Sequence, residues 1–443
     1  MHDTVPPNLS LNRRFAITTL GCKVNQFEGG SLAEQLVHAG YQQVPFSDVA
    51  DIYIINSCTV TTRSDRDSRR LIRRAKRQNP DARIVVTGCY AQVAPEELHA
   101  LPEVTQVIGN ADKQFFLTLL HQGVSQVTSY QDAPDTPVLP LTSYRDQTRA
   151  FLQIQNGCDS GCSYCIVPTA RGKSRSVPYP QIIETAQSLF QAGHHELVLT
   201  GIHIGAYGLD LQPSHNLSAL VQQLLIDCQV ERIRLGSLEP TELSDHLIQL
   251  IAGEPRLCKH LHIPLQSGSD RILAAMNRQY SRSFYAERIL AAASCMPRAF
   301  IAADLIVGYP GESDTDFQES IELLERLPIS DLHIFPYSRR PGTDADTAPG
   351  HLPPAVITER AAIAQKVSQS KREAFWRQAV GTTVSVLGNR KMVGEQLLEG
   401  LSDNYLTVRY PATDADRNRI VDVTITELVD GVLWGNTTNT AKN

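Results

Sequence analysis

A loop with three cysteines constrains this chain of 443 residues more than any other stretch. The loop spans residues 156–165 and follows a strand-like run at 151–155. Its cysteines have the spacing Cys-x3-Cys-x2-Cys; they are Cys158, Cys162 and Cys165. Because Gly157 and Gly161 allow sharp turns in so short a loop, the three thiolates are able to point at one centre. We therefore expect a strand that ends in a metal-binding loop.

Three kinds of centre are compatible with three thiolates. A structural zinc site takes a fourth Cys or His, and none occurs in the twenty-five residues after Cys165. A disulfide framework needs an oxidising compartment, of which the sequence gives no sign. A four-iron cluster held by three thiolates keeps one iron open for a further ligand, which is how such a cluster gains chemistry. We favour the iron–sulfur cluster.

The first part of the chain alternates β-rich runs with helical stretches. Strands are expected at 15–19, 52–56, 83–87 and 106–108, and helices at 29–39, 64–78, 95–101 and 111–121. This alternation predicts an N-terminal α/β domain with an open, mostly parallel sheet.

A cysteine follows each of the first three expected strands; they are Cys22, Cys58 and Cys89. The carboxyl ends of adjacent parallel strands line one crevice, so we expect these three residues to meet in space. Free cysteines are often simply part of a core. Their shared position at the strand ends favours a second cluster instead.

A second alternation begins at residue 151, after a proline-bearing linker. Strands are expected at 151–155, 196–200, 232–235, 260–263, 302–307 and 331–335, with helices between successive strands at 180–192, 217–228, 243–251, 270–276 with 283–295, and 314–326. Six such units predict a partial TIM-type (β/α)6 barrel whose site lies at the carboxyl ends of its strands. Candidate rim residues at those ends are Gly201, Ser237, Glu239, Gln266 and Asp304.

The last part of the chain is expected to form a small β-barrel. A connecting helix at 354–379 is followed by short strands at 382–387, 405–410 and 420–428, with glycines at the turns. We therefore divide this α/β chain into an N-terminal domain (13–122), a linker (123–143), the partial barrel (144–376) and the C-terminal barrel (377–440).

The composition indicates the cellular compartment and the use of the cysteines. The chain has nine cysteines, no apolar run of membrane-spanning length and no secretory signal pattern at its start. We therefore expect a cytoplasmic protein, without a membrane, that uses its thiols for metal or redox chemistry. A net charge of −6 argues against a protein that coats nucleic acid nonspecifically.

One helix is nevertheless strongly basic. The stretch 64–78 places arginines at i, i+3, i+4 and i+7 spacing on one face; they are Arg66, Arg69, Arg70, Arg73 and Arg77. A charged face is usually just solvated. On an otherwise acidic protein, directly after Cys58, it is also a candidate surface for RNA phosphates.

The three-cysteine spacing resembles the signature loop of the radical S-adenosylmethionine (SAM) superfamily, and the chain from about residue 13 to 438 resembles its methylthiotransferases. The motifs that carry the resemblance are Leu20-Gly21-Cys22-Lys23-Val24-Asn25-Gln26, Asn56-Ser57-Cys58-Thr59-Val60-Thr61, Ala170-Arg171-Gly172-Lys173-Ser174-Arg175-Ser176, Ser237-Leu238-Glu239-Pro240, Pro264-Leu265-Gln266-Ser267-Gly268-Ser269-Asp270 and Pro336-Tyr337-Ser338. The stretch Lys23–Gln26 is most similar to members that act on N6-threonylcarbamoyladenosine (t6A) at tRNA position 37.

The resemblance implies two [4Fe-4S] clusters and SAM as cofactors. The SAM cluster is implied for Cys158, Cys162 and Cys165, and an auxiliary cluster for Cys22, Cys58 and Cys89. Tyr164 and the rim residues are implied to bind the cofactor, and Arg171, Lys173 and Arg175 to meet a SAM carboxylate or RNA phosphate. The reaction implied adds a methylthio group to C2 of the adenine of t6A37 and uses two SAM molecules. The C-terminal barrel is then an RNA-binding TRAM domain, and the electron donor is a flavodoxin or ferredoxin.

Two alternatives stay open. The same chemistry acts in related enzymes on isopentenyladenosine or on a ribosomal-protein aspartate. A metal-bearing RNA-binding protein without catalysis would hold zinc, contain no labile sulfide and leave SAM intact. The oligomeric state is not predicted by the sequence.

Overall fold

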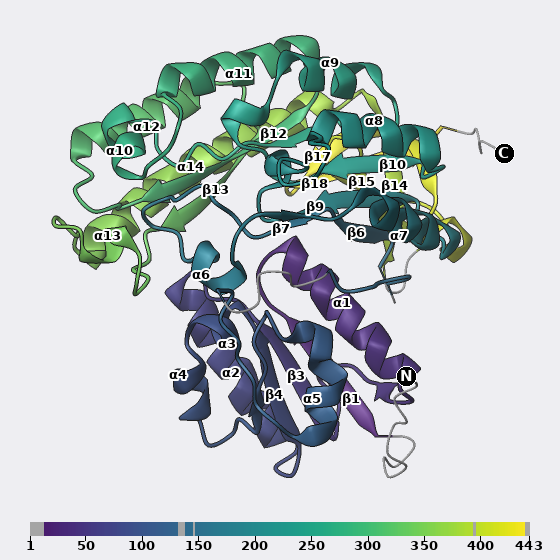
Figure 1. Ribbon diagram of the computed structural model, residues 1–443. Helices are drawn as coiled ribbons and strands as arrows, with labels where there is room; N and C mark the ends of the chain where they lie inside the picture. The colour runs from purple at the N-terminus through teal and green to yellow at the C-terminus, as the bar shows by residue number, and fades with distance from the viewer. Residues whose placement is uncertain (1–12, 132–137, 145–146, 393–395, 439–443) are drawn as a thin grey trace. The chain divides into compact units, whose positions relative to one another are not determined.

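A computed structural model describes residues 13–131, 138–144, 147–392 and 396–438 of the chain. It divides into two compact units (Figure 1). The first holds the residues up to Ser143 together with Gly157–Asp159 and Cys165–Lys173. The second holds Tyr144–Asn156, Ser160–Tyr164 and the chain from Ser174. Each unit is described by itself.

The first unit is built on a five-stranded parallel sheet with the order β2-β1-β3-β4-β5. The strands are β1 (Arg14–Thr19), β2 (Gln42–Gln43), β3 (Ile52–Ser57), β4 (Arg83–Gly88) and β5 (Gln106–Val107). The helices are α1 (Lys23–His38), α2 (Thr62–Gln78), α3 (Cys89–Val93), α4 (Pro95–His99) and α5 (Phe116–Gln122). This confirms the predicted N-terminal α/β domain.

Alternate residues of the central strand explain why helices cover both faces of this sheet. Tyr53 and Ile55 of β3 belong to the core on the side of α2, whereas Ile52 and Ile54 belong to the core on the side of α1 and α5. All six residues of β3 are buried. A strand that is apolar on both sides is typical of a parallel sheet between two helical layers.

Helix α1 begins at Lys23, six residues before the expected start at 29. Gly29 and Gly30 therefore lie inside the helix and not at its start. A Cβ atom at Gly29 would come within 2.2 Å of the Thr19 hydroxyl, so the glycine lets α1 pack closely against β1. As a result, Cys22 is the N-cap residue of α1.

The second unit contains six parallel strands in two three-stranded sheets, β10-β9-β6 and β11-β12-β13. The strands are β6 (Arg149–Gln153), β9 (Glu196–Thr200), β10 (Arg232–Leu235), β11 (His260–His262), β12 (Phe300–Val307) and β13 (Asp331–Pro336). Bridges from Ser237 to His262 and from Ile233 to Leu257 connect the two sheets. The six strands confirm the predicted partial barrel.

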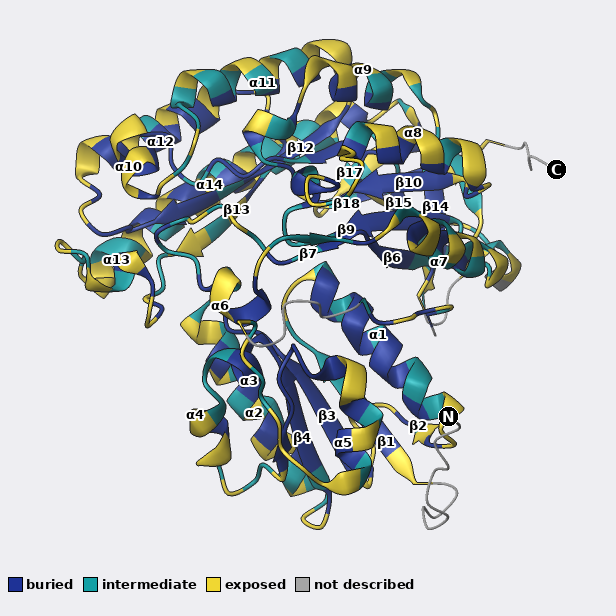
Figure 2. Ribbon diagram, in the orientation of Figure 1, coloured by how far each residue is buried: buried dark blue, intermediate teal, exposed yellow. Residues whose placement is uncertain are grey.

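The helices of this barrel lie close to their predicted positions. They are α7 (Tyr179–Gln191), α8 (Leu217–Asp227), α9 (Asp245–Gly253), α10 (Asp270–Ala275), α11 (Arg282–Cys295) and α12 (Asp314–Arg326). Figure 2 shows the pattern expected for such a barrel, with buried strands and exposed residues on the outer sides of the helices.

The C-terminal barrel is closed, with the order β14-β15-β16-β18-β17. The long helix α14 (Pro354–Ala379) leads into it. Its strands are β14 (Thr383–Lys391), β15 (Leu397–Ser402), β16 (Thr407–Pro411), β17 (Ile420–Val429) and β18 (Val432–Thr437). The predicted small barrel is confirmed, although β15 and β18 were not among the predicted strands.

Two buried arginines join the C-terminal barrel to the partial barrel within the second unit. Arg232 donates to the carbonyl oxygens of Leu401 (3.1 Å) and Ser385 (2.9 Å). Arg234 donates to the carbonyl oxygens of Ser402 and Asp403, both at 3.0 Å. The buried carboxylate of Glu196 pairs with both arginines, at 3.2 and 2.8 Å. The last two predicted domains therefore form one unit.

Candidate functional site

The three cysteines of the first unit lie where its adjacent strands end. Cys22 is the N-cap of α1, Cys58 directly follows β3, and Cys89 is the first residue of α3. Strands β1, β3 and β4 are neighbours, so the sheet brings the three residues to one edge. A Cβ atom at Gly21 would lie 2.8 Å from the Cys58 sulfur, which places the Cys22 loop directly beside that thiol.

The electrostatics of these thiols reflect a shared, largely buried site. Cys58 and Cys89 are buried, whereas Cys22 is exposed. Burial and the neighbouring Cys89 and Cys22 raise the pKa of Cys58 to about 11. Without a compensating positive charge, three thiols this close together resist ionisation. A bound metal centre supplies such a charge.

Near the thiols of the first unit, Glu28, Lys113 and Arg171 form a buried ion cluster. Lys113 is 2.5 Å and Arg171 is 2.8 Å from a carboxylate oxygen of Glu28. Although burial raises the pKa of Glu28, the charges of Arg171 and Lys113 lower it to about 2. Arg171 is only 1% exposed. It therefore presents no surface charge to an RNA phosphate, which corrects that part of its prediction; a contact with a SAM carboxylate stays a prediction.

The division of the chain places the three-cysteine loop on both units. Cys158 and Cys165 belong to the first unit and Cys162 to the second. The backbone N–H of Cys158 donates to the carbonyl oxygen of Gly172 at 3.1 Å, so the loop start is tied to the segment that follows Cys165. Convergence of these three thiolates on one cluster stays a prediction.

In the second unit, the middle of this loop is fixed on the end of α10. Ser163 donates through its N–H to Met276 and through its hydroxyl to Ala275, at 3.2 and 2.9 Å. The Asn277 amide donates to the carbonyl oxygen of Gly161 at 2.8 Å. Tyr164 packs beside the apolar cluster that contains Ile272 and Tyr309. The loop therefore has a defined course before any cofactor binds.

A buried arginine lies next to Cys162. Arg278 donates to the Cys162 sulfur at 3.2 Å, pairs with Glu239 and lies over the ring of Tyr280. Burial raises the pKa of Glu239 even though Arg278 opposes this effect. The guanidinium therefore places a hydrogen-bond donor and a positive charge beside the sulfur of Cys162. Of the predicted rim residues, Glu239 thus lies in the surroundings of the loop.

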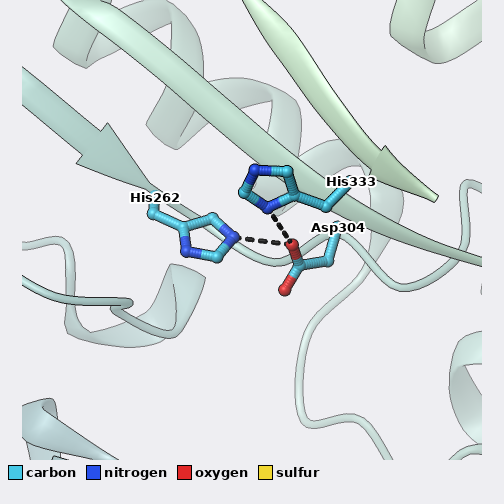
Figure 3. Close-up of side chains that lie close together, drawn as sticks. All are labelled: His262, Asp304 and His333. Carbon is cyan, nitrogen blue, oxygen red and sulfur yellow. Dashed lines mark hydrogen bonds and ion pairs between the residues drawn. The ribbon is translucent and has the colours of Figure 1, made fainter. Parts of the chain in front are cut away.

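Three side chains on neighbouring strands of the second unit converge at another part of the rim (Figure 3). The Oδ1 atom of Asp304, on β12, lies 2.6 Å from Nε2 of His262 and 3.1 Å from Nδ1 of His333. The hydroxyl oxygen of Ser237 lies 2.6 Å from Nδ1 of His262. Burial works against ionisation of Asp304, but the hydrogen bonds from both histidines lower its pKa to about 2. A charged Asp304 therefore holds both rings in place.

The other predicted rim residues also lie at strand ends of the second unit. Gly201 directly follows β9. Gln266 has a left-handed backbone, with φ 64°, and donates its N–H to the carbonyl oxygen of Asp304 at 2.8 Å. Such a conformation is costly for a residue with a side chain and is frequent at functional sites.

The basic helix α2 keeps most of its charge at the surface. Arg66, Arg70, Arg73 and Arg77 are exposed. Arg69 instead is half-buried and donates to the Tyr90 hydroxyl at 2.5 Å. Lys173 is exposed and Arg175 half-buried, so both remain candidates for an anionic ligand.

Sequence analysis missed several residues of these sites. They are Glu28, Lys113, His262, Arg278 and His333. One signal was available: Glu28 falls on the apolar side of α1 between Val24 and Leu32, where a charge is unexpected. The pairing of residues far apart in the sequence had no local signal.

Comparison with known proteins agrees with this arrangement. The model described as uncharacterized protein family UPF0004 matches residues 14–109, and the radical SAM superfamily model matches residues 152–324. A threonylcarbamoyladenosine tRNA methylthiotransferase MtaB from Bacillus subtilis is 37% identical over 93% of each chain. One from Aquifex aeolicus is 40% identical over 89% of this chain and 96% of its own.

More distant relatives share the same length. A tRNA-2-methylthio-N(6)-dimethylallyladenosine synthase from Moorella thermoacetica is 32% identical over 96% of this chain and 98% of its own. Among solved structures, the radical SAM methyltransferase TsrM from Kitasatospora setae matches 76% of this chain and 77% of its own, with a TM-score of 0.54 and 14% identity. That likeness concerns the fold alone.

A radical SAM barrel combined with a second thiol-bearing α/β domain defines a class of enzyme with two cofactor sites. Because relatives at 37% and 40% identity extend over most of its length, the chain belongs to the radical SAM methylthiotransferase family. Two [4Fe-4S] clusters and SAM are the cofactors of this family. That the two sets of three cysteines hold the clusters stays a prediction. No helix of the described residues is long and apolar enough to cross a membrane.

Proposed function

We propose that this chain adds a methylthio group to C2 of the adenine of t6A at position 37 of tRNA. The observation that carries the proposal is the higher identity to the threonylcarbamoyladenosine enzymes, 37% and 40%, than to the dimethylallyladenosine synthase, 32%. The stretch Lys23–Gln26, directly after Cys22, supports the same substrate, since it resembles the threonylcarbamoyladenosine members.

Different residues of the chain would hold the cofactors and position the reacting groups. When bound, the clusters and two SAM molecules supply radical cleavage of the C2–H bond and a methylated sulfur for that carbon, chemistry that no side chain achieves near pH 7. Cys158, Cys162 and Cys165 would hold the SAM cluster, and Cys22, Cys58 and Cys89 the auxiliary cluster. Arg278 would place a positive charge beside the cluster ligand Cys162. The Asp304–histidine group fixes the barrel rim where the base has to be oriented.

The compartment and the electron donor of the enzyme are part of this proposal. We infer that it works in the cytoplasm, where tRNA is found, and that a flavodoxin or ferredoxin supplies electrons to the SAM cluster. A membrane has no part in this reaction. A protein that bound RNA and zinc without catalysis would leave SAM intact.

Deleting the gene tests the function in the cell. We expect 2-methylthio-t6A to disappear from the tRNA nucleosides, as measured by mass spectrometry. The wild-type gene should restore it, and a gene with Cys162→Ala should not. If 2-methylthio-t6A persists at wild-type levels in the deletion strain, another substrate has to be sought.

We propose that the exposed arginines of α2 contact tRNA phosphates. Replacing Arg66, Arg70, Arg73 and Arg77 by glutamine should weaken binding of tRNA and lower the slope of log K against log salt by about three, because each phosphate contact releases a counterion. Fluorescence anisotropy across a salt series measures both quantities. Neutralising the exposed Arg326, Lys366 and Arg377 of the second unit is the control. A slope equal to that of the wild type would remove α2 from the RNA-binding surface.

A further inference from the structure

Arg171 connects the segment after the three-cysteine loop to the thiols of the first unit. It ends the short helix α6 (Val167–Arg171), six residues after Cys165. Besides Glu28, its guanidinium donates to the side-chain oxygen of Asn25. The charges of Glu28, Cys89 and Cys22 raise its pKa well above the ordinary value, although burial alone would lower it. The guanidinium is thus a permanent positive charge near these thiols.

The partners of Arg171 extend this contact to the cysteine loops. Asn25 is fully buried and donates to the carbonyl oxygens of Leu20 and Ser57, at 2.8 and 2.9 Å. Leu20 lies two residues before Cys22, and Ser57 lies one residue before Cys58. Asn110 donates to the carbonyl oxygen of Ala170 at 2.9 Å and to the Cys89 sulfur at 3.5 Å. The α6 segment is thereby bonded, directly or through one side chain, to all three cysteine loops.

The three groups of this ion cluster carry a positive excess. Arg171 and Lys113 contribute two positive charges and Glu28 one negative charge, so the three together carry one positive charge. An oxidised four-iron cluster with three thiolates carries a net charge of about −1. Such a cluster at Cys22, Cys58 and Cys89 would balance the group.

We propose that Arg171 is a positioning residue of the auxiliary cluster, which raises its reduction potential and fixes its cysteine loops. This inference rests on the two-cluster arrangement of the proposed function. A positive charge beside a cluster favours the reduced, more negative form, and hydrogen bonds around the thiolates act in the same direction. Glu28 opposes the effect, because its negative charge lies in the same interior.

The potential of the auxiliary cluster tests the proposal. The full-length chain with Cys158, Cys162 and Cys165 replaced by alanine is reconstituted, so that its only expected cluster is the auxiliary one. A redox titration followed by electron paramagnetic resonance then compares Arg171→Met, Arg171→Lys and Glu28→Gln. Arg14→Met removes an exposed arginine at the opposite ends of the strands and is the matched control. Iron and sulfide content and the melting temperature are measured for each protein.

Opposite shifts are expected for the two kinds of variant. Arg171→Met should lower the equilibrium constant for reduction at least tenfold, a shift of about 59 mV to lower potential for one electron. Glu28→Gln should move the potential upward, and Arg171→Lys should restore much of the loss. Arg14→Met should match the parent protein.

Unchanged potentials in cluster-bearing Arg171→Met would overturn the proposal. If Arg171→Met does not hold the cluster, Glu28→Gln decides: an upward shift supports the proposal, and an unchanged or lower potential contradicts it. The readout is separate from product formation. If the variants show these shifts but the wild-type chain, with all its cysteines, makes no 2-methylthio-t6A, the proposed function alone is disproved.

Discussion

Cys58→Ala abolishes methylthio transfer to tRNA and leaves cleavage of SAM in place, whereas Cys162→Ala abolishes both. This result is expected because the two residues belong to different sets of three thiols, each sufficient for one open-iron cluster. Removing Cys58 removes one of three ligands from the buried site in the first unit. The product is expected to fall below about 1% of the wild-type amount, because losing a transition-state group on which the reaction depends costs several orders of magnitude in rate.

Three measurements test whether SAM cleavage and methylthio transfer separate in this way. Iron content should fall from about eight to about four atoms per chain in either variant. Chromatography measures 5′-deoxyadenosine from SAM cleavage, and mass spectrometry measures the methylthiolated nucleoside. Cys295→Ala, an exposed cysteine at the end of α11, is the control and should keep both activities. Cys58→Ala with wild-type product, or without any SAM cleavage, would refute the assignment of two independent sets.

Glu196→Gln strongly destabilises the second unit. The carboxylate is fully buried between Arg232 and Arg234, and removing its charge leaves two buried guanidinium groups without a counter-ion. Breaking a buried ion pair in this way costs about 3–5 kcal/mol. We expect the melting temperature to fall by about 10 °C. Because both arginines also bind carbonyls of the C-terminal barrel, the barrel should loosen as well.

The conditions of this test follow from the pKa of Glu196. Burial raises it, but Arg234 and Arg232 lower it from 4.5 to about 2. Because the pKa of Glu196 is lower in the folded state than in the unfolded state, its ionised form stabilises the folded protein at pH values above 4.5. This contribution is lost only as the pH falls from 4.5 toward 2. Calorimetry near pH 7.5 therefore measures the full effect. Glu231→Gln, half-exposed and paired with His195, is the neighbouring control. A Glu196→Gln protein that melts with the wild type would show that this ion cluster does not hold the unit together.

The architecture was largely predictable because local signals and strand ends coincide. All six strands of the partial barrel and the four main strands of the first sheet lie at their predicted places. Some of the errors involve glycine. Gly29 and Gly30 lie inside α1, whose first six residues were not predicted, and Gly400 and Gly435 lie inside the missed strands β15 and β18. The short elements β2, α3 and α6 were also not predicted. Glycine usually marks turns, but here it allows close packing inside regular elements.

The candidate site was predictable as far as its cysteines and not beyond. The cysteines follow strands, and strand order alone brings Cys22, Cys58 and Cys89 to one edge. Arg171 and Glu28 are 143 residues apart, and no periodicity links them. The same holds for Arg278 and Cys162, 116 residues apart. Such pairs depend on tertiary packing, so the sequence suggested Arg171 only as a contact for a SAM carboxylate or RNA phosphate, although it is buried against Glu28. The predicted domain boundaries stay predictions.

The most direct test of the account uses anticodon stem-loops with t6A, isopentenyladenosine or unmodified adenosine at position 37. Each is incubated with the reconstituted wild-type enzyme, SAM and a reductant, and the product nucleosides are identified by mass spectrometry. The account predicts 2-methylthio-t6A from the first stem-loop and no methylthio product from the other two. Methylthiolation of isopentenyladenosine with t6A left unchanged would contradict it.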